Sequence, residues 1–517
     1  MLQMLKIFFI KGRYMLIKRI TDYLEKTVQL HKDDIAIIDE LHKLTFGQLR
    51  QKALNIAGVL INNEIFKKPV VVLMDKNCDM VVSFLGIAYS GNYYTPIDIN
   101  MPEERVEKIL KTLNPAYVII GSGAEKMAET LGLGNYETAL YYDIVLENPN
   151  TEEKILPVTK RIIDTDILYV LFTSGSTGNP KGVIISHRSV IDYIEWVTDT
   201  FNITSDDRFA NQAPFYFDNS ILDIYCMLKT GCTMYIVPEK LFTFPIGLMK
   251  YLEDNKITSI FWVPSALCLV ANLKALGKQK LSNMKRILFC GEPMPNKQLN
   301  MWRQEYPDVQ YANLYGPTEI TDVCSYYIVN REFADSDPLP IGFPCENTDI
   351  VILNDKDELV KHGEIGELCV RGSSLAYGYY NDEKRTKEAF VQNPLNKNYK
   401  EIIYRTGDLV YYNEYDELVY VSRKDFQIKH MGHRIELGEI ENAVYAVQGI
   451  TRCCCLYNSE CNKIVLFYTG QADIKIIKKI LKKKIPEYMV PSDIRLLEQM
   501  PLNLNGKIDR VKLKEIL

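Results

Sequence analysis

Apolar runs and helical patterns alternate along most of the chain. From Leu44 onward, stretches with apolar residues at helical spacing are separated by short runs rich in β-branched and aromatic residues. Several runs end at Gly or Pro, or lead into a helical stretch, which is typical of strands in an α/β fold with largely parallel sheets. The predicted strands are residues 70–74, 117–121, 168–173, 233–237, 259–263 and 287–290.

The pattern changes beyond about Glu346, where short strands and turns dominate. From about Lys424, the chain mixes strands with a helix over 438–447 and a lysine-rich helix over 474–484. This change predicts a domain boundary near residues 423–425, with a large domain over residues 1–423 and a small one over 424–517. Between Glu346 and that boundary, strands are predicted over residues 349–353, 366–371 and 417–421.

The composition is that of a large globular protein. Hydrophobic residues make up 47% of the 517 residues and charged residues 25%, and the net charge of −5 gives no sign of a nucleic-acid binder. The 12 cysteines are scattered, apart from three adjacent ones at 453–455, which suit neither a disulfide framework nor a zinc site. We therefore expect reduced thiols and a cytoplasmic protein.

The N-terminal run 1–10 is apolar, but it is too short to span a membrane. No small-residue cleavage site follows it, and Met15 is a second plausible start. Residues 1–14 carry no function in this interpretation. No other segment approaches the roughly 20 apolar residues of a membrane helix, so we expect no stable membrane insertion.

Residues 171–182 have the chemistry of a phosphate-binding loop. They contain several hydroxyl residues with Gly175 and Gly178, and they end in Pro180, Lys181 and Gly182. Glycines let backbone N–H groups turn toward an anion, while hydroxyls and a lysine add donors and positive charge. The pattern differs from a Walker A loop, in which Lys and Ser/Thr directly follow the second Gly. The alternative is a mobile Gly/Ser-rich turn, and the lysine after a β-rich run favours a polyphosphate site.

This loop resembles the signature loop of the adenylate-forming superfamily, which includes acyl-CoA synthetases, firefly luciferase and the adenylation domains of nonribosomal peptide synthetases. The resemblance implies two parallel-type sheets packed in αβαβα layers plus a β-rich subdomain, and a small α+β C-terminal domain that is mobile. It extends over nearly the whole chain, in order and with suitable spacing, through residues 44–49, 91–96 with Pro102 and Arg105, 315–319, 404–409, 424–429, 432–441 and 505–510.

The resemblance also implies the reaction and the ATP site. Such enzymes join a carboxylate to the α-phosphate of ATP and release pyrophosphate, so cations and donors must face the developing charge. Tyr315 would stack on adenine, Thr318 would reach the α-phosphate, and Glu319 would bind Mg²⁺, which prefers oxygen ligands. Taken outside the motif, Tyr315 could be an ordinary core residue and Glu319 a solvated surface acid. The triphosphate would be held by Thr173, Ser174, Gly175, Ser176, Thr177, Gly178 and Lys181.

The remaining motifs imply a ribose site, a hinge and a catalytic lysine. Asp408 is similar to the residue that takes both ribose hydroxyls, and Arg423 to a second ribose ligand. Ser422 stands where the family usually has glycine, which bears on the geometry of the hinge. Asp425 resembles the hinge on which the small domain swings. Lys507 resembles the catalytic lysine that bridges the carboxylate and the ribose, acting with Thr318 and Glu319.

Residues 211–220 bear on which carboxylate is activated. A buried amino-acid substrate brings an ammonium group, and burying it unpaired is costly, so a carboxylate partner is expected. In peptide-synthetase relatives an Asp in a Phe-Asp-x-Ser run takes this role, and Asp218 matches that position. Fatty acyl-CoA synthetases lack this Asp. The alternative is that Asp218 caps the helix that follows.

The rest of the substrate pocket is carried over by position from the same relatives. Cys290, in the run 289–292, resembles the D-alanine–D-alanyl carrier protein ligases, in which a cysteine here favours the D-enantiomer. D-alanine is therefore the leading substrate, although Asp322 is unusual for an alanine pocket and could bind a polar or cationic side chain. Another amino acid of a nonribosomal peptide or natural-product pathway is the alternative. The pocket would comprise Asn219, Leu222, Phe261, Leu288, Cys290, Leu314, Asp322 and Val323.

The sequence also suggests an acceptor. Neither a carrier-domain motif nor a condensation-domain motif is visible, so we expect a free-standing enzyme that passes its product to the phosphopantetheine thiol of a separate carrier protein. The lysine-rich helix 474–484 could attract an acidic carrier, or it could be a solvated face.

Two rival functions remain. Asp218 argues against an acyl-CoA synthetase. A degenerate nucleotide binder is disfavoured by the retained Lys181, Glu319, Asp408 and Lys507.

Overall fold

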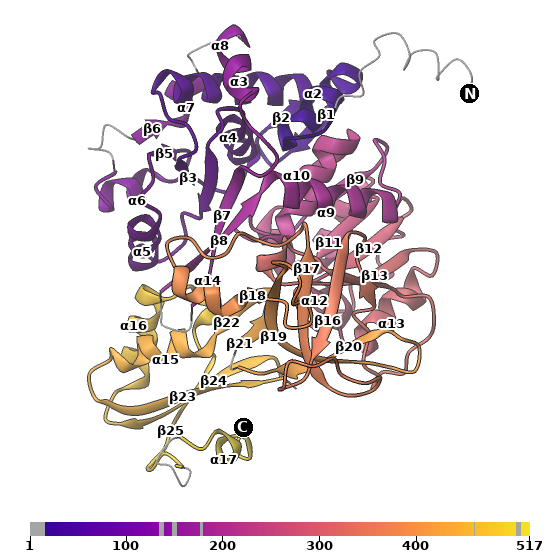
Figure 1. Ribbon diagram of the computed structural model, residues 1–517. Helices are drawn as coiled ribbons and strands as arrows, with labels where there is room; N and C mark the ends of the chain where they lie inside the picture. Colours follow the sequence, from indigo (N-terminus) through magenta and orange to yellow (C-terminus); the bar gives the residue numbers. More distant parts are fainter. Residues whose placement is uncertain are drawn as a thin grey trace.

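The computed structural model describes residues 16–133, 139–146, 152–175, 179–425, 427–459, 461–502 and 508–517. Two large sheets and their helices make up most of the molecule, a β-rich subdomain projects from them, and a small domain, gold in Figure 1, closes the chain. This architecture confirms the α/β fold class expected from the sequence. The predicted boundary at 423–424 falls between the strands β20 and β21.

The first sheet has six strands in the order β6-β5-β3-β4-β7-β8. All neighbouring pairs are parallel except β7 and β8, which are antiparallel. Both faces are covered, as in most parallel sheets: in β3, Val70 and Val72 face one core while Val71 and Leu73 face another. The strands are β3 (Pro69–Leu73), β4 (Tyr93–Ile97), β5 (Tyr117–Ile120), β6 (Ala139–Tyr141), β7 (Ile167–Thr173) and β8 (Lys181–Ser186).

The second sheet has nine strands in the order β15-β14-β13-β12-β11-β9-β10-β1-β2. Its six central strands are parallel, and antiparallel strands close both edges. The strands are β1 (Ile35–Ile38), β2 (Lys43–Thr45), β9 (Arg208–Asn211), β10 (Thr233–Ile236), β11 (Ser259–Trp262), β12 (Arg286–Phe289), β13 (Gln310–Tyr315), β14 (Ser325–Ile328) and β15 (Phe343–Pro344).

Helices fill three layers around these sheets, which gives the expected αβαβα order. One core joins the inner faces of both sheets to a central layer of α2 (Ile20–His31), α3 (Phe46–Asn62), α4 (Cys78–Tyr89), α9 (His187–Thr200) and α10 (Asn219–Thr230). The outer face of the first sheet is covered by α5 (Glu103–Leu113) and α6 (Glu125–Thr130). The outer face of the second is covered by α11 (Pro245–Asp254), α12 (Pro264–Asn272) and α13 (Asn296–Glu305).

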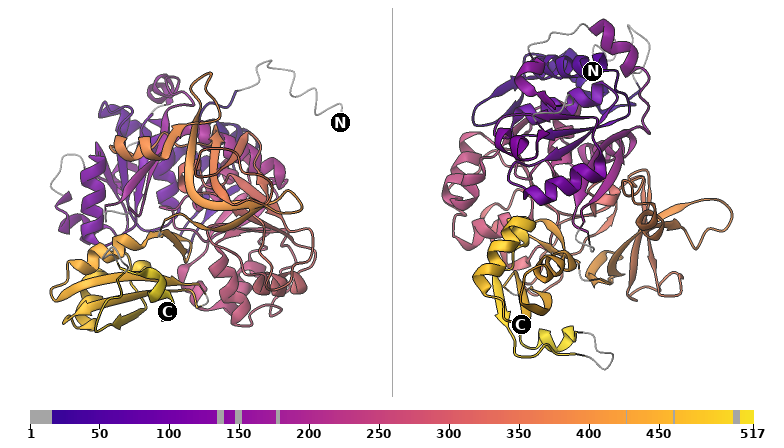
Figure 2. Two further views of the ribbon diagram at one scale, coloured as in Figure 1. Left: turned by 60° about the horizontal axis from the view of Figure 1, so that its bottom comes forward. Right: turned by 90° about the vertical axis from the view of Figure 1, so that its left-hand side faces the viewer.

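Shorter helices complete the large domain. They are α7 (Tyr142–Leu146), α8 (Glu152–Thr159), α14 (Glu383–Ala389) and the 3₁₀ helices η2 (Glu239–Thr243) and η3 (Thr318–Ile320). The β-rich subdomain is an antiparallel five-stranded sheet, seen projecting to one side in the right-hand view of Figure 2. Its strands are β16 (Thr348–Leu353), β17 (Gly366–Gly372), β18 (Phe390–Gln392), β19 (Ile402–Tyr412) and β20 (Leu418–Arg423).

The small domain begins with a two-stranded hairpin, β21 (Gln427–His430) and β22 (His433–Glu436). It continues as a three-stranded sheet with helices on it, and its own core is separate from those of the large domain. The lysine-rich helix has the predicted bounds. The elements are α15 (Leu437–Tyr445), β23 (Ile450–Asn458), β24 (Lys463–Gly470), α16 (Ile474–Lys484), η4 (Glu487–Met489), β25 (Asp493–Leu496) and α17 (Arg510–Lys514).

Two expectations from composition can be compared with this fold. All 12 cysteines are free thiols, and the three at 453–455 are buried within β23. Among the residues that the structure describes, no helix is both long enough and apolar enough to cross a membrane.

A buried histidine makes the stability of the central layer depend on pH. His187, the first residue of α9, is 1% exposed, and its Nδ1 accepts a hydrogen bond of 3.3 Å from the backbone N–H of Ile20. Burial lowers the pKa of His187 to about 4, although the nearby charges of Asp166 and Asp22 raise it. Between pH 6.5 and 4 the unfolded chain therefore binds a proton that the folded chain does not.

We expect this difference to make the protein less stable as the pH falls. From pH 7 to pH 5 the parent should lose about 2 kcal/mol more of its free energy of unfolding than a His187→Asn variant, which keeps an acceptor for Ile20. Denaturant unfolding at both pH values measures the loss. The exposed His362 supplies the control, His362→Asn, which should behave as the parent does. Equal losses in the parent and His187→Asn would contradict the prediction.

Candidate active site

The described start of the predicted phosphate loop, at the end of β7, contacts the small domain. The Thr173 hydroxyl is buried without a hydrogen-bond partner. The Ser174 hydroxyl donates to the backbone oxygen of Arg434 at 2.6 Å, and the Gly175 N–H donates to the carboxylate of Glu439 at 3.2 Å. Ser176, Thr177 and Gly178 lie outside the described residues.

Lys181 and Glu319 form the charged centre of the site. Lys181, the first residue of β8, places its Nζ 3.0 Å from the Glu319 carboxylate, which is fully buried in η3. Arg434 from the hairpin binds the other carboxylate oxygen at 2.7 Å, and the Tyr379 hydroxyl donates at 2.7 Å. Burial alone would raise the pKa of Glu319, but the charges of Arg434 and Lys181 hold it well below its usual range. Glu319 is therefore an ionised carboxylate in a buried setting.

Tyr315 and the predicted ribose ligands form a connected chain beside this centre. The Tyr315 hydroxyl, at the end of β13, donates to Asp408 in β19. Arg423 binds Asp408 at 2.6 Å and also pairs with Asp425, with a nitrogen 2.6 Å from its carboxylate. The Lys429 ammonium lies 4.9 Å from the centre of the Tyr315 ring. The four sequence-predicted residues thus meet at the junction of the two domains.

Asp218 is buried close to Thr318, the residue before Glu319. It is the N-cap of α10, and its carboxylate accepts a hydrogen bond of 3.1 Å from the N–H of Asn219. Burial raises the pKa of Asp218, while a hydrogen bond with Thr318 lowers it. A cavity of about 50 Å³ is lined by Asp218, Asn219 and Thr318 together with Lys429 from the hairpin.

The other predicted pocket residues lie behind this cavity, in the core between the two sheets. Asp322 is 1% exposed, and its carboxylate accepts a hydrogen bond of 2.8 Å from the Tyr193 hydroxyl. The charge of Asp322 contributes to the raised pKa of Cys290, as burial does, so these two side chains are close together. The apolar members pack in one hydrophobic core: Leu222, Phe261, Leu288, Leu314 and Val323.

The hairpin β21–β22 enters the site, a feature that the sequence did not reveal. Its Arg434 binds Glu319, and its Lys429 lies over Tyr315. The His433 ring also packs edge-on against Phe217, with centroids 4.4 Å apart. Lys429 and Arg434 fall in motifs that the sequence singled out, but nothing local indicated that their side chains reach the large domain.

A buried ion pair holds the small domain in this position. Arg105 in α5 binds Glu439 in α15 at 2.6 Å, and both side chains are 5% exposed or less. Docking removes both charges from water and separation returns them to it, so this pair fixes the geometry of the docked arrangement more than it adds to its stability. In Figure 1, α5 lies directly above α16 and α15 of the small domain. Lys507 lies outside the described residues, so its place relative to the cavity is not part of this geometry.

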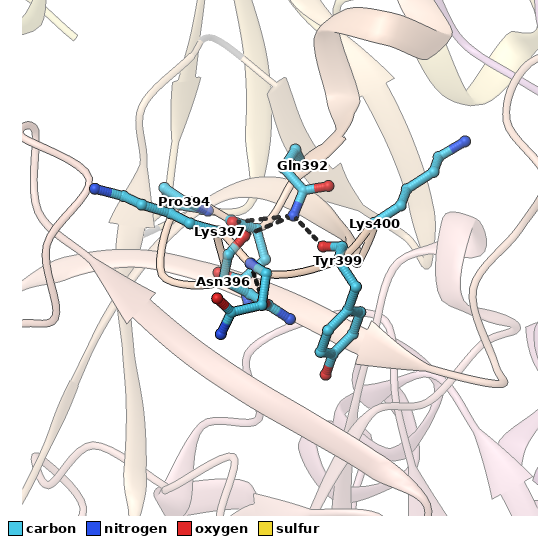
Figure 3. A pocket seen from close by; sticks show the side chains of 8 residues that line it. Gln392, Pro394, Asn396, Lys397, Tyr399 and Lys400 are labelled. Atoms are coloured by element: carbon cyan, nitrogen blue, oxygen red, sulfur yellow. Dashed lines mark hydrogen bonds between the residues drawn. The ribbon is translucent and has the colours of Figure 1, made fainter.

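A larger hollow, of about 410 Å³, lies on the β-rich subdomain, away from these residues. It is formed by the loop 392–400 alone (Figure 3). The side-chain amide of Gln392 points into the loop and donates to the backbone oxygens of Asn396 at 2.9 Å and Tyr399 at 3.2 Å. These hydrogen bonds are made within the loop. None of the predicted site residues that the structure describes lines this hollow.

Comparison with known proteins identifies the family. Residues 24–380 match the AMP-binding enzyme family, and residues 439–507 match the AMP-binding enzyme C-terminal domain. The chain belongs to the AMP-binding enzyme family. The resemblance drawn from the sequence motifs is therefore confirmed.

The chain is similar to both long and short members of this family. It is 32% identical to tyrocidine synthase 3 of Brevibacillus parabrevis over 93% of its own length, but it spans 7% of that protein. It is 30% identical to a D-alanine–D-alanyl carrier protein ligase of Bacillus licheniformis, with 96% of this chain and 99% of the ligase covered. The fold matches the Vibrio cholerae adenylation domain AlmE, solved with glycyl-adenosine-5'-phosphate, at a TM-score of 0.83 and 21% identity, covering 98% and 99% of the two chains.

Proposed function

We propose that the protein activates an amino acid with ATP as the aminoacyl-AMP, releases pyrophosphate, and passes the aminoacyl group to the phosphopantetheine thiol of a separate carrier protein. The main support is that Asp218 and Thr318 line the same cavity, while Lys181 and Glu319 lie within hydrogen-bond distance of each other beside it. The proposed ammonium partner and the proposed polyphosphate-binding centre would then be neighbours. An amino acid whose ammonium group is held by Asp218 would have its carboxylate toward Thr318 and the phosphates of ATP. The reaction would take place in the cytoplasm, where ATP is available.

The residues present suit ATP and Mg²⁺. Glu319 is ionised and buried, and a carboxylate oxygen is a ligand that Mg²⁺ accepts. No group of three or more metal-ligating side chains occurs among the described residues, which fits an ion held by one carboxylate and the phosphates of ATP. When bound, Mg²⁺ would neutralise the charge of the phosphates. Thr173 has a free hydroxyl for the same phosphates, and Tyr315 and Asp408 would take adenine and ribose.

The docked hairpin favours a two-stage cycle with Asp425 as the hinge. Lys181 and Arg434 together occupy both oxygens of Glu319, so the hairpin and a metal compete for the same carboxylate. Adenylation would therefore need the hairpin to leave, and the arrangement seen here suits the later transfer to a thiol. Domain closures of this kind are hinge motions. Asp425 lies between β20 and β21, where Arg423 holds it.

The structure gives less support for a particular acyl substrate or acceptor than for the adenylation reaction. D-alanine, which Cys290 favours and the relative from Bacillus licheniformis is named for, is the first substrate to test. Asp322 is a buried acid next to Cys290, and it does not suit a methyl side chain. For the acceptor, the lysines of α16 offer positive charge to an acidic carrier protein.

The experiment that tests the proposal is ATP–pyrophosphate exchange with D- and L-amino acids, fatty acids and aryl acids. Exchange that depends on one or a few amino acids supports the function. Exchange with another acid and with no amino acid would mean that Asp218 does not bind an ammonium group. Transfer is then measured with a phosphopantetheinylated carrier protein as acceptor.

Lys507 is expected to serve adenylation alone. Lys507→Ala should slow exchange by about 100-fold or more, because a cation near the developing charge is lost. Transfer from a chemically prepared aminoacyl-AMP to the thiol should change little. The control is Lys514→Ala, which replaces a lysine in the last turn of α17. A Lys507→Ala enzyme that adenylates as fast as the parent would remove this assignment.

A further inference from the structure

Two carboxyl groups lie buried at the substrate end of the site, and the protein gives neither an ion-pair partner among the residues described. Asp218 is 8% exposed and Asp322 is 1% exposed. Their hydrogen-bond partners are neutral: the Asn219 N–H for Asp218, and the Tyr193 hydroxyl for Asp322. Within the described parts of the chain, no lysine, arginine or histidine forms a salt bridge with either group. Burial raises the pKa of both groups, and the charge of Lys429, a hairpin residue that lines the cavity, lowers it without forming an ion pair with either. In the proposed cycle Lys429 leaves with the hairpin before adenylation, and because buried carboxylates are normally paired, both groups would then lack a cation.

The backbone holds Asp322 directly behind the wall of the cavity. Gly316 lines the cavity with Thr318, and a Cβ atom at Gly316 would lie 2.2 Å from the backbone oxygen of Asp322. Asp322 and the preceding Thr321 both adopt positive φ angles, 75° and 61°. L-residues rarely adopt this conformation, and such residues cluster at functional sites. The turn after η3 therefore holds Asp322 in this position behind the cavity wall at a cost in backbone strain.

Unpartnered polar atoms beside the two carboxyl groups also indicate a polar ligand. The Tyr169 hydroxyl, in the fully buried part of β7, has no hydrogen-bond partner, and neither does the side-chain nitrogen of Asn219. Burial raises the pKa of Tyr169, and the charges of Asp218 and Asp322 raise it further, so its hydroxyl lies near both. Buried polar groups in native proteins are nearly always paired. The Tyr169 oxygen could accept a hydrogen bond from a cationic side chain, whereas the Asn219 nitrogen is a donor and would need an acceptor such as the carboxylate of the substrate.

The surrounding apolar residues limit the length of that side chain. Leu288, Cys290 and Leu314 are 2% exposed or less, and they share one core with Val323, which follows Asp322. A long side chain would have to displace this packing, which costs free energy. The end of the pocket is therefore acidic and short.

We propose that the amino acid activated by this enzyme is a short diamino acid, such as 2,3-diaminopropionate or 2,4-diaminobutyrate. Its α-ammonium pairs with Asp218, and its side-chain ammonium pairs with Asp322, with the Tyr169 hydroxyl as a further partner. This inference rests on the proposed amino-acid adenylation. A neutral side chain would leave Asp322 either uncompensated or protonated, whereas a diamino acid matches both carboxylates.

The test compares kcat/KM for ATP–pyrophosphate exchange in the parent and in an Asp322→Asn variant. The substrates are both enantiomers of the two diamino acids, alanine, serine and asparagine. Asparagine has the chain length of 2,4-diaminobutyrate but ends in a neutral amide. The parent should prefer a diamino acid. In Asp322→Asn, the ratio of diaminobutyrate to asparagine activity should fall at least about thirtyfold, because one buried charge partner is lost. Tyr193→Phe keeps the carboxylate and should lower the ratio less.

Each outcome separates this inference from the function on which it rests. A parent enzyme that prefers alanine, serine or asparagine would overturn the diamino-acid assignment and leave amino-acid adenylation intact. A preference for a diamino acid with an unchanged ratio in Asp322→Asn would overturn the pairing of its side-chain ammonium with Asp322. Exchange with no amino acid at all would instead remove the proposed function. Because the parent's own preference decides the first question, a poorly folding variant does not leave the proposal untested.

Discussion

Replacing Glu319 by glutamine is expected to slow adenylation by about 100-fold or more. Glu319 is fully buried and carries the negative charge that balances Lys181 and Arg434. Removing one preorganised electrostatic group from an active site typically slows the reaction by about 100-fold or more. The variant would also lose the carboxylate that we assign to Mg²⁺. ATP–pyrophosphate exchange over a range of Mg²⁺ concentrations measures both effects, and the variant should need more Mg²⁺ than the parent.

A second buried glutamate provides a matched control for this variant. Glu417 is 4% exposed and is bound by Arg331, with a nitrogen 2.7 Å from its carboxylate, next to the first residue of β20 in the β-rich subdomain. Glu417→Gln removes the same group from a similar setting, so it should cost stability without slowing exchange. If Glu319→Gln exchanged within about threefold of the parent, Glu319 would be a structural residue only. If both variants were equally slow, the loss would reflect folding.

Much of the fold could be predicted because its signals are local. The strands of both large sheets are buried on two faces, so they appear as unbroken apolar runs such as residues 70–74, which became β3. The helix α16 has the predicted bounds because its lysines and isoleucines alternate at helical spacing. The antiparallel pairing of β8 with β7 was not predictable in this way. The apolar pattern of a buried strand is the same in a parallel and an antiparallel pair, so it does not encode pairing direction.

The residues of the candidate site also differ in whether a local sequence signal marks them. Motif residues such as Lys181 and Asp408 could be named from their neighbours in sequence. Contacts between the domains could not, because Lys429 and Arg434 act on the large domain only when the hairpin is docked. The composition of the motif at 432–441 is equally compatible with a hairpin that faces solvent. The position of the small domain depends on long-range contacts, such as the ion pair between Arg105 and Glu439, which are distant in sequence.

Replacing Gly432 by leucine is expected to abolish transfer to the thiol while leaving adenylation within a few-fold of the parent. Gly432 lies in the turn of the hairpin with φ of 77°, and a Cβ atom there would lie 2.4 Å from a methyl carbon of Val263 in the large domain. Real Cβ atoms do not tolerate such a contact, so the docked hairpin would have to move. If adenylation takes place with the hairpin withdrawn, the same side chain should not disturb it. Separate assays of exchange and of thioester formation on a carrier protein measure the two steps.

Three further variants separate the clash from simple backbone strain. Gly363 has φ of 81°, and a Cβ atom there would meet no other atom within 4 Å, so Gly363→Leu carries the left-handed strain of about 1–2 kcal/mol without a clash. It should leave both steps near the parent's rates. Gly432→Ala combined with Val263→Ala removes the contacting methyl and should recover part of the transfer that Gly432→Ala alone loses. A Gly432→Leu enzyme that lost both steps equally would show that the hairpin stays docked during adenylation, and the two-stage cycle would have to be abandoned.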